Sequence, residues 1–543
     1  MLKKIFLATI LSIFLIQNIC AAESGNCGDN VRWNFDGSTL TISGNGKMTD
    51  FLIEDKNSAQ YGWFYDTGWE NFKNRITAIV VQDGVTSVGS HAFADLTNLK
   101  TVTLANSVQF IGSQAFSGCT NLETITFSAT AKTGDEVFAR CDKLSNLNTV
   151  DATGKILVAS NNLNANEYNR WAKVVNSYLY VDGENLIRVE NIGGKVLVEK
   201  YSADFKLLSS QNLDIKFELW GGFFAGKNFN FIITGKSNDA ESDSNEVISI
   251  SKFDKNFNLL DTAKIFGSNT KVPFDAASLR CAEKNGTLYI HTGHKMYRSP
   301  DGLNHQASMS IFVNESTMQI SNINYAVSNI STGYVSHSFN QFILVDDRNN
   351  VVYFDHGDAF PRAAVLIRGK QNVEIVKFAG YMGDNATGAA IGGLAETNNN
   401  YVTAYTYDGR GGNMNDYFGV INQRDMFLSF TSKNNFATGT LTFKAPDPNY
   451  SYGTPILVPT SLNGGYVLCN ETKFDGKYFK PSGRIIFADY EDGGKSNTIQ
   501  AVEGQLSDCQ PIIFNGKVTW YVTNNSAPIF YTLDEGGVTA HKS

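Results

Sequence analysis

The stretch that decides the fold is ITAIVVQDGVTSVGSHAFADLTNLK (76–100), which recurs as TVTLANSVQFIGSQAFSGCTNLE (101–123). A degenerate third copy follows at TITFSATAKTGDEVFARCDKLS (124–145). The apolar residues recur by repeat and not by helix turn, in the columns Ile79/Val102/Ile125, Val81/Leu104/Phe127, Phe93/Phe116/Phe138 and Leu99/Leu122/Leu144. Such self-similarity is typical of a solenoid, in which stacked coils share one core and leave a continuous surface suited to large partners. The pattern favours recognition over chemistry.

Two motifs within these copies, SVGSHAFADLTNL and FIGSQAFSGCTNL, resemble the BspA-like (treponemal-type) leucine-rich repeat family. The upstream segment CGDNVRWNFDGSTLTISGNGKMTDF (27–51) looks like the β cap that often precedes such repeats in secreted bacterial proteins. Gly68-Trp69 stands where that family usually has Pro-Trp. The resemblance implies a surface protein that binds extracellular-matrix proteins or other cells.

Length and composition set the outer bounds. A chain of 543 residues exceeds a single hydrophobic core, so we expect two or more domains. The formal net charge is −8 and no basic patch is evident, which argues against a nucleic-acid partner.

The N-terminal residues predict export from the cytoplasm. Residues 1–22 read as a signal peptide, with Lys3 and Lys4 before an apolar run and with small residues Ala21 and Ala22 at its end. We expect no transmembrane span, because no second long apolar run follows. The predicted location is therefore secreted or cell-surface.

Six cysteines follow the predicted cleavage site, and an even count permits disulfides in an oxidising compartment. Cys119 and Cys141 occupy one repeat column, where strand spacing would also allow a bridge. A ladder of buried thiols, acting as small apolar groups, is the favoured interpretation. Cys469 and Cys509 could form a second bridge, and the sequence leaves this open.

The sequence pattern changes near residue 150 to short stretches of alternating apolar and polar residues separated by Gly, Asn and Asp. VLVEKYSADFKLL (196–208) and ISISKFDKNFNLL (248–260) form a second internal repeat. Four-stranded units of this period predict a mainly β domain, a β-propeller of six to eight blades with seven as the best estimate. The predicted blades are 171–213, 216–265, 274–322, 325–369, 373–434, 437–499 and 501–534. A strand at ILVAS (156–160) could complete the short last blade and close the ring.

The predicted organisation is thus a signal peptide (1–22), an N-terminal β cap (23–75), BspA-like repeats (76–149) and a propeller (150–543). Aromatic residues before the first repeat, Tyr61, Trp63, Tyr65 and Trp69, could stack on sugar. Packing of the cap onto the first coil is the favoured role, because Trp is usually buried.

Ligand-binding candidates gather in predicted blades three and four. They are His291, His294, His305, His337, Asp355, His356, Asp358 and Arg362. Loops of neighbouring blades converge near the channel of a propeller, so these residues could form one polar pocket. The alternative is that the histidines hydrogen-bond one blade to the next.

Two metal hypotheses receive little support from spacing, and we expect no metal or cofactor. His291 and His294 are three apart on an apparent strand, which sends them to opposite faces unless Thr292-Gly293 is a turn. The acidic run Asp239, Glu241, Asp243 and Glu246 lacks the glycine and terminal glutamate of a helix-loop-helix calcium site, so we expect a solvated loop.

One enzymatic alternative has a physical basis. FDHGDAFPR (354–362) is loosely similar to a stretch of bacterial arylsulfotransferases, which are exported propellers. That likeness implies His356 or His337 as nucleophile and Arg362 as a fork for the anionic group. A structural role in an envelope assembly is the third hypothesis. We expect a secreted or cell-surface binding protein for extracellular protein or glycan ligands rather than an enzyme.

Overall fold

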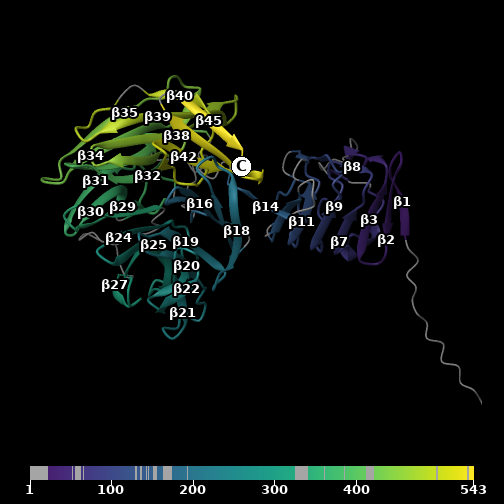
Figure 1. Cartoon of the computed structure of the whole chain (residues 1–543), viewed down its shortest axis with the longest axis horizontal. Helices are drawn as coiled ribbons and strands as arrows, with labels where there is room; N and C mark the ends of the chain where they lie inside the picture. Colours follow the sequence, from purple (N-terminus) through teal and green to yellow (C-terminus); the bar gives the residue numbers. More distant parts are fainter. Residues whose placement is uncertain are drawn as a thin grey trace, which may run out of the picture. The chain divides into compact units, whose positions relative to one another are not determined.

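The computed structural model describes residues 23–51, 53–54, 63–64, 67–128, 131–134, 137–141, 143–144, 146–150, 156–162, 174–192, 194–324, 340–359, 361–384, 386–410, 421–496, 499–534 and 537–542. The chain divides into two compact units, residues 1–159 and 160–543 (Figure 1). The predicted signal peptide, Tyr61, Tyr65 and His337 lie outside the described residues.

The first unit is a two-sheet solenoid. Its main sheet runs in parallel through β3 (Thr39–Gly44), β7 (Ala78–Val81), β9 (Thr101–Leu104), β11 (Thr124–Ser128) and β13 (Asn146–Val150). The antiparallel strands β1 (Glu23–Gly28) and β2 (Val31–Phe35) cap it at one end, and β14 (Ile156–Asn161) pairs with β13 at the other. The second sheet holds β4 (Gly46–Lys47), β8 (Val85–Val88), β10 (Phe110–Ile111) and β12 (Lys132–Thr133).

Short elements complete this unit: the hairpin β5 (Ile53–Glu54) and β6 (Trp63–Phe64), and the 3₁₀ helix η1 (Glu70–Arg75). Within the described ranges, no helix has the length and apolar content needed to cross a membrane.

The predicted columns form the core. Phe93 stacks on Phe116 at 5.3 Å between ring centroids, and Phe116 on Phe138 at 5.9 Å. Trp69 extends this ladder at 5.6 Å from Phe93 and is only 1% exposed. The packing role predicted for Trp69 is therefore confirmed.

A column of glycines allows successive coils to pack closely. A Cβ placed on Gly89 would lie 1.8 Å from the Thr49 carbonyl oxygen, and one on Gly112 would lie 2.3 Å from the Ser90 nitrogen. Gly134 repeats the arrangement at 2.6 Å. The motif carries glycine here because successive coils touch through their backbones.

The cysteine column is a ladder of thiols that are not joined by a disulfide, as favoured above. The Cys119 and Cys141 Sγ atoms each lie 3.1 Å from a carbonyl oxygen of the preceding coil, on Phe93 and Phe116. Cys469 and Cys509 are also free and lie in different clusters of the core. The second possible bridge is therefore absent from the structure.

The second unit is a ring of seven antiparallel sheets (Figure 1). Blade 1 contains β15 (Ser177–Asp182), β16 (Asn185–Ile192), β17 (Lys195–Tyr201) and β18 (Leu207–Asp214); blade 2 contains β19 (Leu219–Ala225), β20 (Asn230–Gly235), β21 (Glu246–Phe253) and β22 (Leu259–Phe266). Blade 3 contains β23 (Thr270–Pro273), β24 (Leu279–Lys284), β25 (Thr287–Arg298), β26 (Asn304–Asn314) and β27 (Ile320–Asn324). Blade 4 contains β28 (Asn340–Val345), β29 (Val351–Asp358), β30 (Arg362–Arg368) and β31 (Gln371–Lys377).

Three further blades complete the ring. Blade 5 contains β32 (Ala389–Glu396), β33 (Asn400–Tyr407), β34 (Asp425–Ser432) and β35 (Thr438–Phe443). Blade 6 contains β36 (Tyr450–Tyr452), β37 (Ile456–Ser461), β38 (Gly464–Phe474), β39 (Phe479–Glu491) and β40 (Gln500–Glu503). Blade 7 contains β41 (Ile512–Phe514), β42 (Lys517–Val522), β44 (Ile529–Asp534) and β45 (Gly537–Lys542), with β43 (Asn524–Ser526) beside it. The expectation of a mainly β, seven-bladed propeller is confirmed, although the later predicted blades begin and end several residues early.

The predicted ring closure by residues 156–160 is wrong. Blade 7 takes all four of its strands from residues 512–542, and β14 pairs with β13 instead; only the end of β14, at Ser160 and Asn161, pairs with β43 beside that blade. Apolar side chains of blades 1 and 7 close the ring, where Phe205 stacks on Phe530 at 5.1 Å and Tyr201 packs edge-on against it at 4.8 Å. Burial of this shared cluster makes an exchanged strand unnecessary.

The 52-residue repeat seen in the sequence is the third strand, outer turn and fourth strand of a blade. The turn places an apolar residue in the left-handed region at Phe205 (φ 62°), Phe257 (φ 64°), Met318 (φ 54°) and Phe436 (φ 59°). Each side chain packs into a cluster shared with the preceding blade. The strained backbone thus positions a wedge between blades.

Candidate functional site

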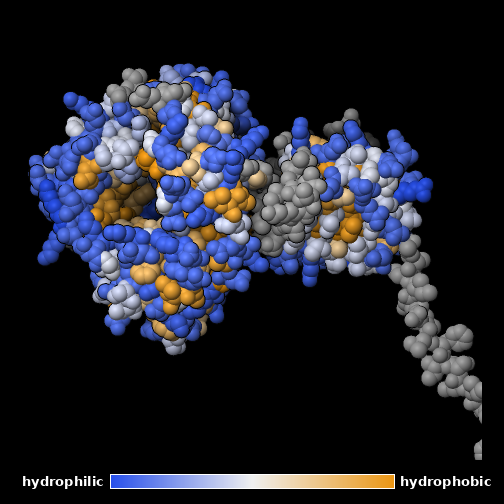
Figure 2. Space-filling view, in the orientation of Figure 1, coloured by the Kyte–Doolittle hydropathy of each residue, from blue (hydrophilic) through white to orange (hydrophobic). Residues whose placement is uncertain are grey.

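The propeller encloses a channel, and several predicted residues lie on the second and third strands of blades 3 and 4. The first strands are β15, β19, β24, β28, β32, β37 and β41, and successive ones contact one another from β19 through β41 to β15, so they are innermost. The face drawn in Figure 2 is hollowed near the centre of the ring. Because strands of a blade alternate in direction, first and third strands begin where second strands end. We call this end the entry end.

His291 and His356 lie on second strands and link blades. His291 on β25 is fully buried, with Nε2 2.7 Å from Asp355 Oδ1 on β29 and Nδ1 2.9 Å from Ser310 Oγ. His356 on β29 places Nε2 2.9 Å from Thr387 Oγ1, in the segment that leads to blade 5. Burial, followed by the charge of Arg362, lowers the pKa of His356 to about 3. Both contacts have the blade-to-blade character of the structural alternative.

The other two candidate histidines that the structure describes, His294 and His305, have separate surroundings. His294 is buried with Nδ1 2.7 Å from Thr270 Oγ1 of β23, in its own blade. His305 is partly exposed and pairs locally with Asp301, Nε2 to Oδ2 at 2.6 Å. Strand β25 runs unbroken through Thr292-Gly293, so His291 and His294 have different partners, as their spacing predicts. The structure does not assemble the histidines into one cluster.

Arg362 holds a loop together. Its Nε donates to the Ala379 carbonyl at 2.8 Å, and Nη2 donates to that of Ala386 at 2.9 Å. Its Nη1 donates to the carbonyls of Asp358, at 3.2 Å, and Asp384. With these bonds made, the guanidinium is not presented as the free anion fork that the sulfotransferase-like hypothesis requires.

The acidic residues between Asp239 and Glu246 in blade 2 also form structural contacts. Glu241 accepts from the Arg298 backbone nitrogen at 2.9 Å and pairs with Lys271 Nζ at 3.4 Å. Glu246 pairs instead with Lys216, on a different side of the run. The run is a bonded loop and strand start, which agrees with the absence of calcium-site features in the sequence.

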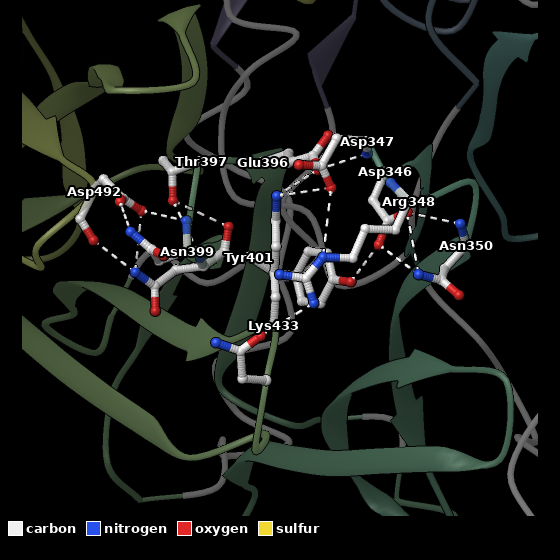
Figure 3. A network of polar contacts seen from close by, with 12 residues as sticks. Asp346, Asp347, Arg348, Asn350, Glu396, Thr397, Asn399, Tyr401, Lys433 and Asp492 are labelled. Atoms are coloured by element: carbon white, nitrogen blue, oxygen red, sulfur yellow. Dashed lines mark hydrogen bonds and ion pairs between the residues drawn. The ribbon is translucent and has the colours of Figure 1, made fainter.

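A polar network at the opposite end of blades 4 and 5 contains the cluster with metal-ligand geometry among the described residues (Figure 3). Asp346, Asp347 and Glu396 form it. Lys433, whose side chain is fully buried, places Nζ 2.6 Å from Glu396 Oε1 and 3.2 Å from Asp347 Oδ1. The ammonium supplies the positive charge that a cation would otherwise bring.

The same network leads to a pocket between blades 5 and 6. Its volume is about 570 Å³ and its lining consists of Asn399, Asn400, Phe430, Ala437, Gly439, Thr440, Leu441, Asp492, Gly493 and Gly494. Asp492 Oδ1 accepts from the backbone nitrogen of Asn399 at 2.9 Å and from Asn400 Nδ2 at 3.2 Å (Figure 3). These bonds fix both asparagines at the pocket wall.

Sequence reasoning missed a polar group, Arg280 with Tyr178 and Asp508, that comes from three different blades. Arg280 and Tyr178 lie at the starts of the innermost strands β24 and β15, and Asp508 precedes β41. Arg280 interacts electrostatically with Tyr178 and Asp508 from two other blades. Burial lowers the pKa of Arg280 and raises that of Asp508 to about 6. SLRCAEKNG is an ordinary strand and turn, and only the ring topology brings these groups together.

Comparison with known proteins gives a family match for part of the N-terminal region. Residues 68–179 match the BspA type leucine-rich repeat region. No curated protein matches the chain. A leucine-rich repeat protein from Eubacterium ventriosum is 20% identical with a TM-score of 0.18, and the match covers 26% of this chain and 48% of that one. The chain therefore spans about half the length of that repeat protein.

Two further solved structures align with a larger share of the chain. An uncharacterised protein from Listeria monocytogenes is 11% identical with a TM-score of 0.35, covering 68% of this chain and 94% of that one. A quinoprotein alcohol dehydrogenase-like protein from Bacteroides thetaiotaomicron is 11% identical with a TM-score of 0.32, covering 66% and 71%. The N-terminal region carries BspA-type leucine-rich repeats, and the C-terminal region has a seven-bladed propeller arrangement.

Proposed function

We propose that the protein is a secreted or cell-surface binding protein that recognises extracellular glycan or protein ligands. The observation that carries the proposal is the pocket of about 570 Å³ between blades 5 and 6. Its volume falls within the range of small-ligand sites. The leucine-rich repeats add a second, continuous surface, so two contacts of modest strength could act together as avidity.

The lining of this pocket suits hydroxyl-rich ligands. The Oδ1 atoms of Asn399 and Asn400 accept no hydrogen bond from the described residues, so both oxygens can accept from a ligand. Phe430, Ala437 and Leu441 add apolar surface beside them. A sugar ring presents the same combination of hydroxyls and apolar faces.

The contacts of the predicted catalytic residues favour binding over catalysis. His356 bonds to Thr387, and Arg362 donates to carbonyl oxygens of its own loop. The polar atoms of His356 are engaged in a contact between blades, and those of Arg362 are engaged in holding a loop. Predicted export through residues 1–22, and the surface location typical of BspA-like proteins, support an extracellular ligand.

The test is a binding screen of residues 23–543 against glycan and matrix-protein arrays, beside a variant that fills the pocket. Gly439 lines the pocket, and a Cβ there would meet no atom within 4 Å, so Gly439→Trp adds a ring without a clash at Cβ. We expect the array signal to fall at least tenfold in this variant.

The matched control is Thr442→Trp, an exposed position of the same strand β35 that does not line the pocket. It should retain the signal. An array signal that survives Gly439→Trp unchanged would remove the pocket from the proposal, and the absence of any signal from the full chain would remove the binding function on these arrays.

A further inference from the structure

Arg280 is a cation without a carboxylate partner at the entry end of the channel. Its Nη1 donates to the carbonyl of the adjacent Leu279 at 3.1 Å, and its guanidinium lies 5.0 Å from the ring centroid of Phe342 on blade 4. Within the described part of the chain, no carboxylate oxygen comes within 4.0 Å of it. A guanidinium carries five N–H donors, so most of its capacity is unused.

The position of this cation is costly for the protein alone. Burial is the first cause of the lowered pKa of Arg280, and the opposing charge of Asp508 acts from beyond ion-pair distance. The residue is nevertheless partly exposed, so a dissolved anion can reach it. A desolvated charge of this kind is stabilised by an anion of matching geometry.

We propose that the entry end of the channel binds the carboxylate of an acidic sugar through the guanidinium of Arg280. The guanidinium fork matches a carboxylate through two parallel N–H···O bonds. The ring of Phe342 on blade 4 lies against one side of the fork, with its centroid 5.0 Å from the guanidinium carbon. The inference rests on the proposed function in taking a glycan as ligand, but it uses a different site from the pocket.

Asp508 gives this site a pH dependence. The charged groups that face its carboxyl are Arg280 and Glu190, and its Oδ2 accepts from the Asn176 backbone nitrogen at 2.9 Å. Burial raises its pKa to about 6, so the carboxyl is neutral at pH 5 and negative at pH 8. A second negative charge repels an anionic ligand, and binding should therefore be tighter at pH 5.

The experiment is calorimetric titration of the full chain with galacturonate, with neutral galactose and inorganic sulfate as comparison probes. Arg280→Met removes the charge, and Arg280→Lys keeps the charge but loses the fork. Arg348→Met is the matched control, because Arg348 is half-exposed and lies in the turn at the opposite end of blade 4. Circular dichroism confirms that each variant is folded.

We expect galacturonate affinity to fall at least tenfold in Arg280→Met, to fall less in Arg280→Lys and to remain in Arg348→Met. Equal binding by Arg280→Met overturns the proposal, and so does sulfate that binds as tightly as galacturonate, since that marks a general anion site. Gly439→Trp separates the two sites: it should leave galacturonate binding intact even where it abolishes the array signal.

Discussion

The solenoid and the propeller both repeat, but the solenoid repeats most of its side-chain contacts, while the propeller repeats its strand arrangement and the apolar residue of its outer turn. Phe93, Phe116 and Phe138 make the same stack from coil to coil. Adjacent blades meet through different groups, such as His291 with Asp355 between blades 3 and 4. Neighbouring strands in a sheet lie about 4.8 Å apart, so the same side chain of successive coils is in direct contact. Facing sheets lie about 10 Å apart, and any set of side chains with complementary shapes can fill the space between them.

The largest expected effect comes from breaking a contact that occurs at one blade interface. Arg188 donates to Glu190 and Glu199 at 2.5 and 2.6 Å, all three side chains are largely buried, and Glu190 also accepts from Tyr521 of blade 7 at 2.9 Å. Arg188→Met leaves two carboxylates without their cation, so the free energy of unfolding should fall by about 3–5 kcal/mol. Denaturant unfolding followed by tryptophan fluorescence measures it.

The control for this variant lies in blade 7, the blade that meets blade 1 where the ring closes. Lys517→Met removes an ion pair with Asp534 whose two side chains are 46% and 40% exposed. Exposed pairs contribute at most about 1 kcal/mol, so its unfolding should be nearly unchanged. Equal losses in the two variants would show that the buried network does not hold the ring closed.

A smaller effect is expected from the repeated backbone contact of the solenoid. In Gly112→Ala the new Cβ would lie 2.3 Å from the Ser90 nitrogen and 2.7 Å from the Gly89 carbonyl carbon, and neither backbone atom can move without separating the coils. Overpacking of this kind costs about 1–3 kcal/mol. Thermal unfolding should show loss confined to the solenoid transition.

Gly439→Ala is the matched glycine in the propeller, because its Cβ would meet nothing within 4 Å. It should leave both transitions in place. If Gly112→Ala unfolds no earlier than Gly439→Ala, then the coils are not held at backbone contact and the glycine column has another origin.

The same contrast explains how much of the fold the sequence predicted. The columns through Phe93 and Phe116 could be recognised in the sequence because each coil packs against a similar coil, so the same position requires the same kind of residue. In the propeller only the outer turn recurs closely enough to detect, since Phe205 and Phe257 occupy the same left-handed position. The number of blades followed from strand spacing, whereas closure by residues 156–160 was predicted wrongly because side-chain packing leaves no pattern along the chain.

The candidate site was less predictable for the same reason. Histidines are rare in this chain, so His291 and His356 were chosen as candidate site residues. In the structure, both form contacts that join neighbouring segments of the ring. Arg280 was not chosen as a candidate residue, because an arginine in a strand is usually exposed and paired. Its place beside Asp508 depends on blades 3 and 7 meeting around a channel, which residue spacing does not encode.

A still smaller effect should isolate the strain in the repeated outer turn. Phe257 adopts φ 64°, a conformation that Asn tolerates better than Ala. Phe257→Ala and Phe257→Asn both lose the ring, so the difference between them reports the backbone. We expect the Asn variant to be more stable by about 0.5–1 kcal/mol in parallel denaturant titrations. Equal stabilities would mean that the turn relaxes once the ring is gone.

The smallest effect is a pH dependence that the apolar columns of the solenoid should lack. Glu315, in the outer turn of blade 3, is 3% exposed, and its pKa is raised to about 7 by burial first and by the charge of Glu283 second, against the opposing charge of Lys252. Its folded pKa lies above the ordinary value of 4.5, so the folded state binds the proton more tightly and loses stability as pH rises from about 5 through 7.

Glu315→Gln stays neutral and keeps the shape of the protonated acid, so its advantage in melting temperature over the parent should grow between pH 5 and pH 8. The exposed Glu218→Gln should show no such growth. The solenoid transition of the same samples provides an internal reference. A parallel shift of both transitions with pH would place the effect outside the blade interface, because only the propeller holds this carboxyl between its blades.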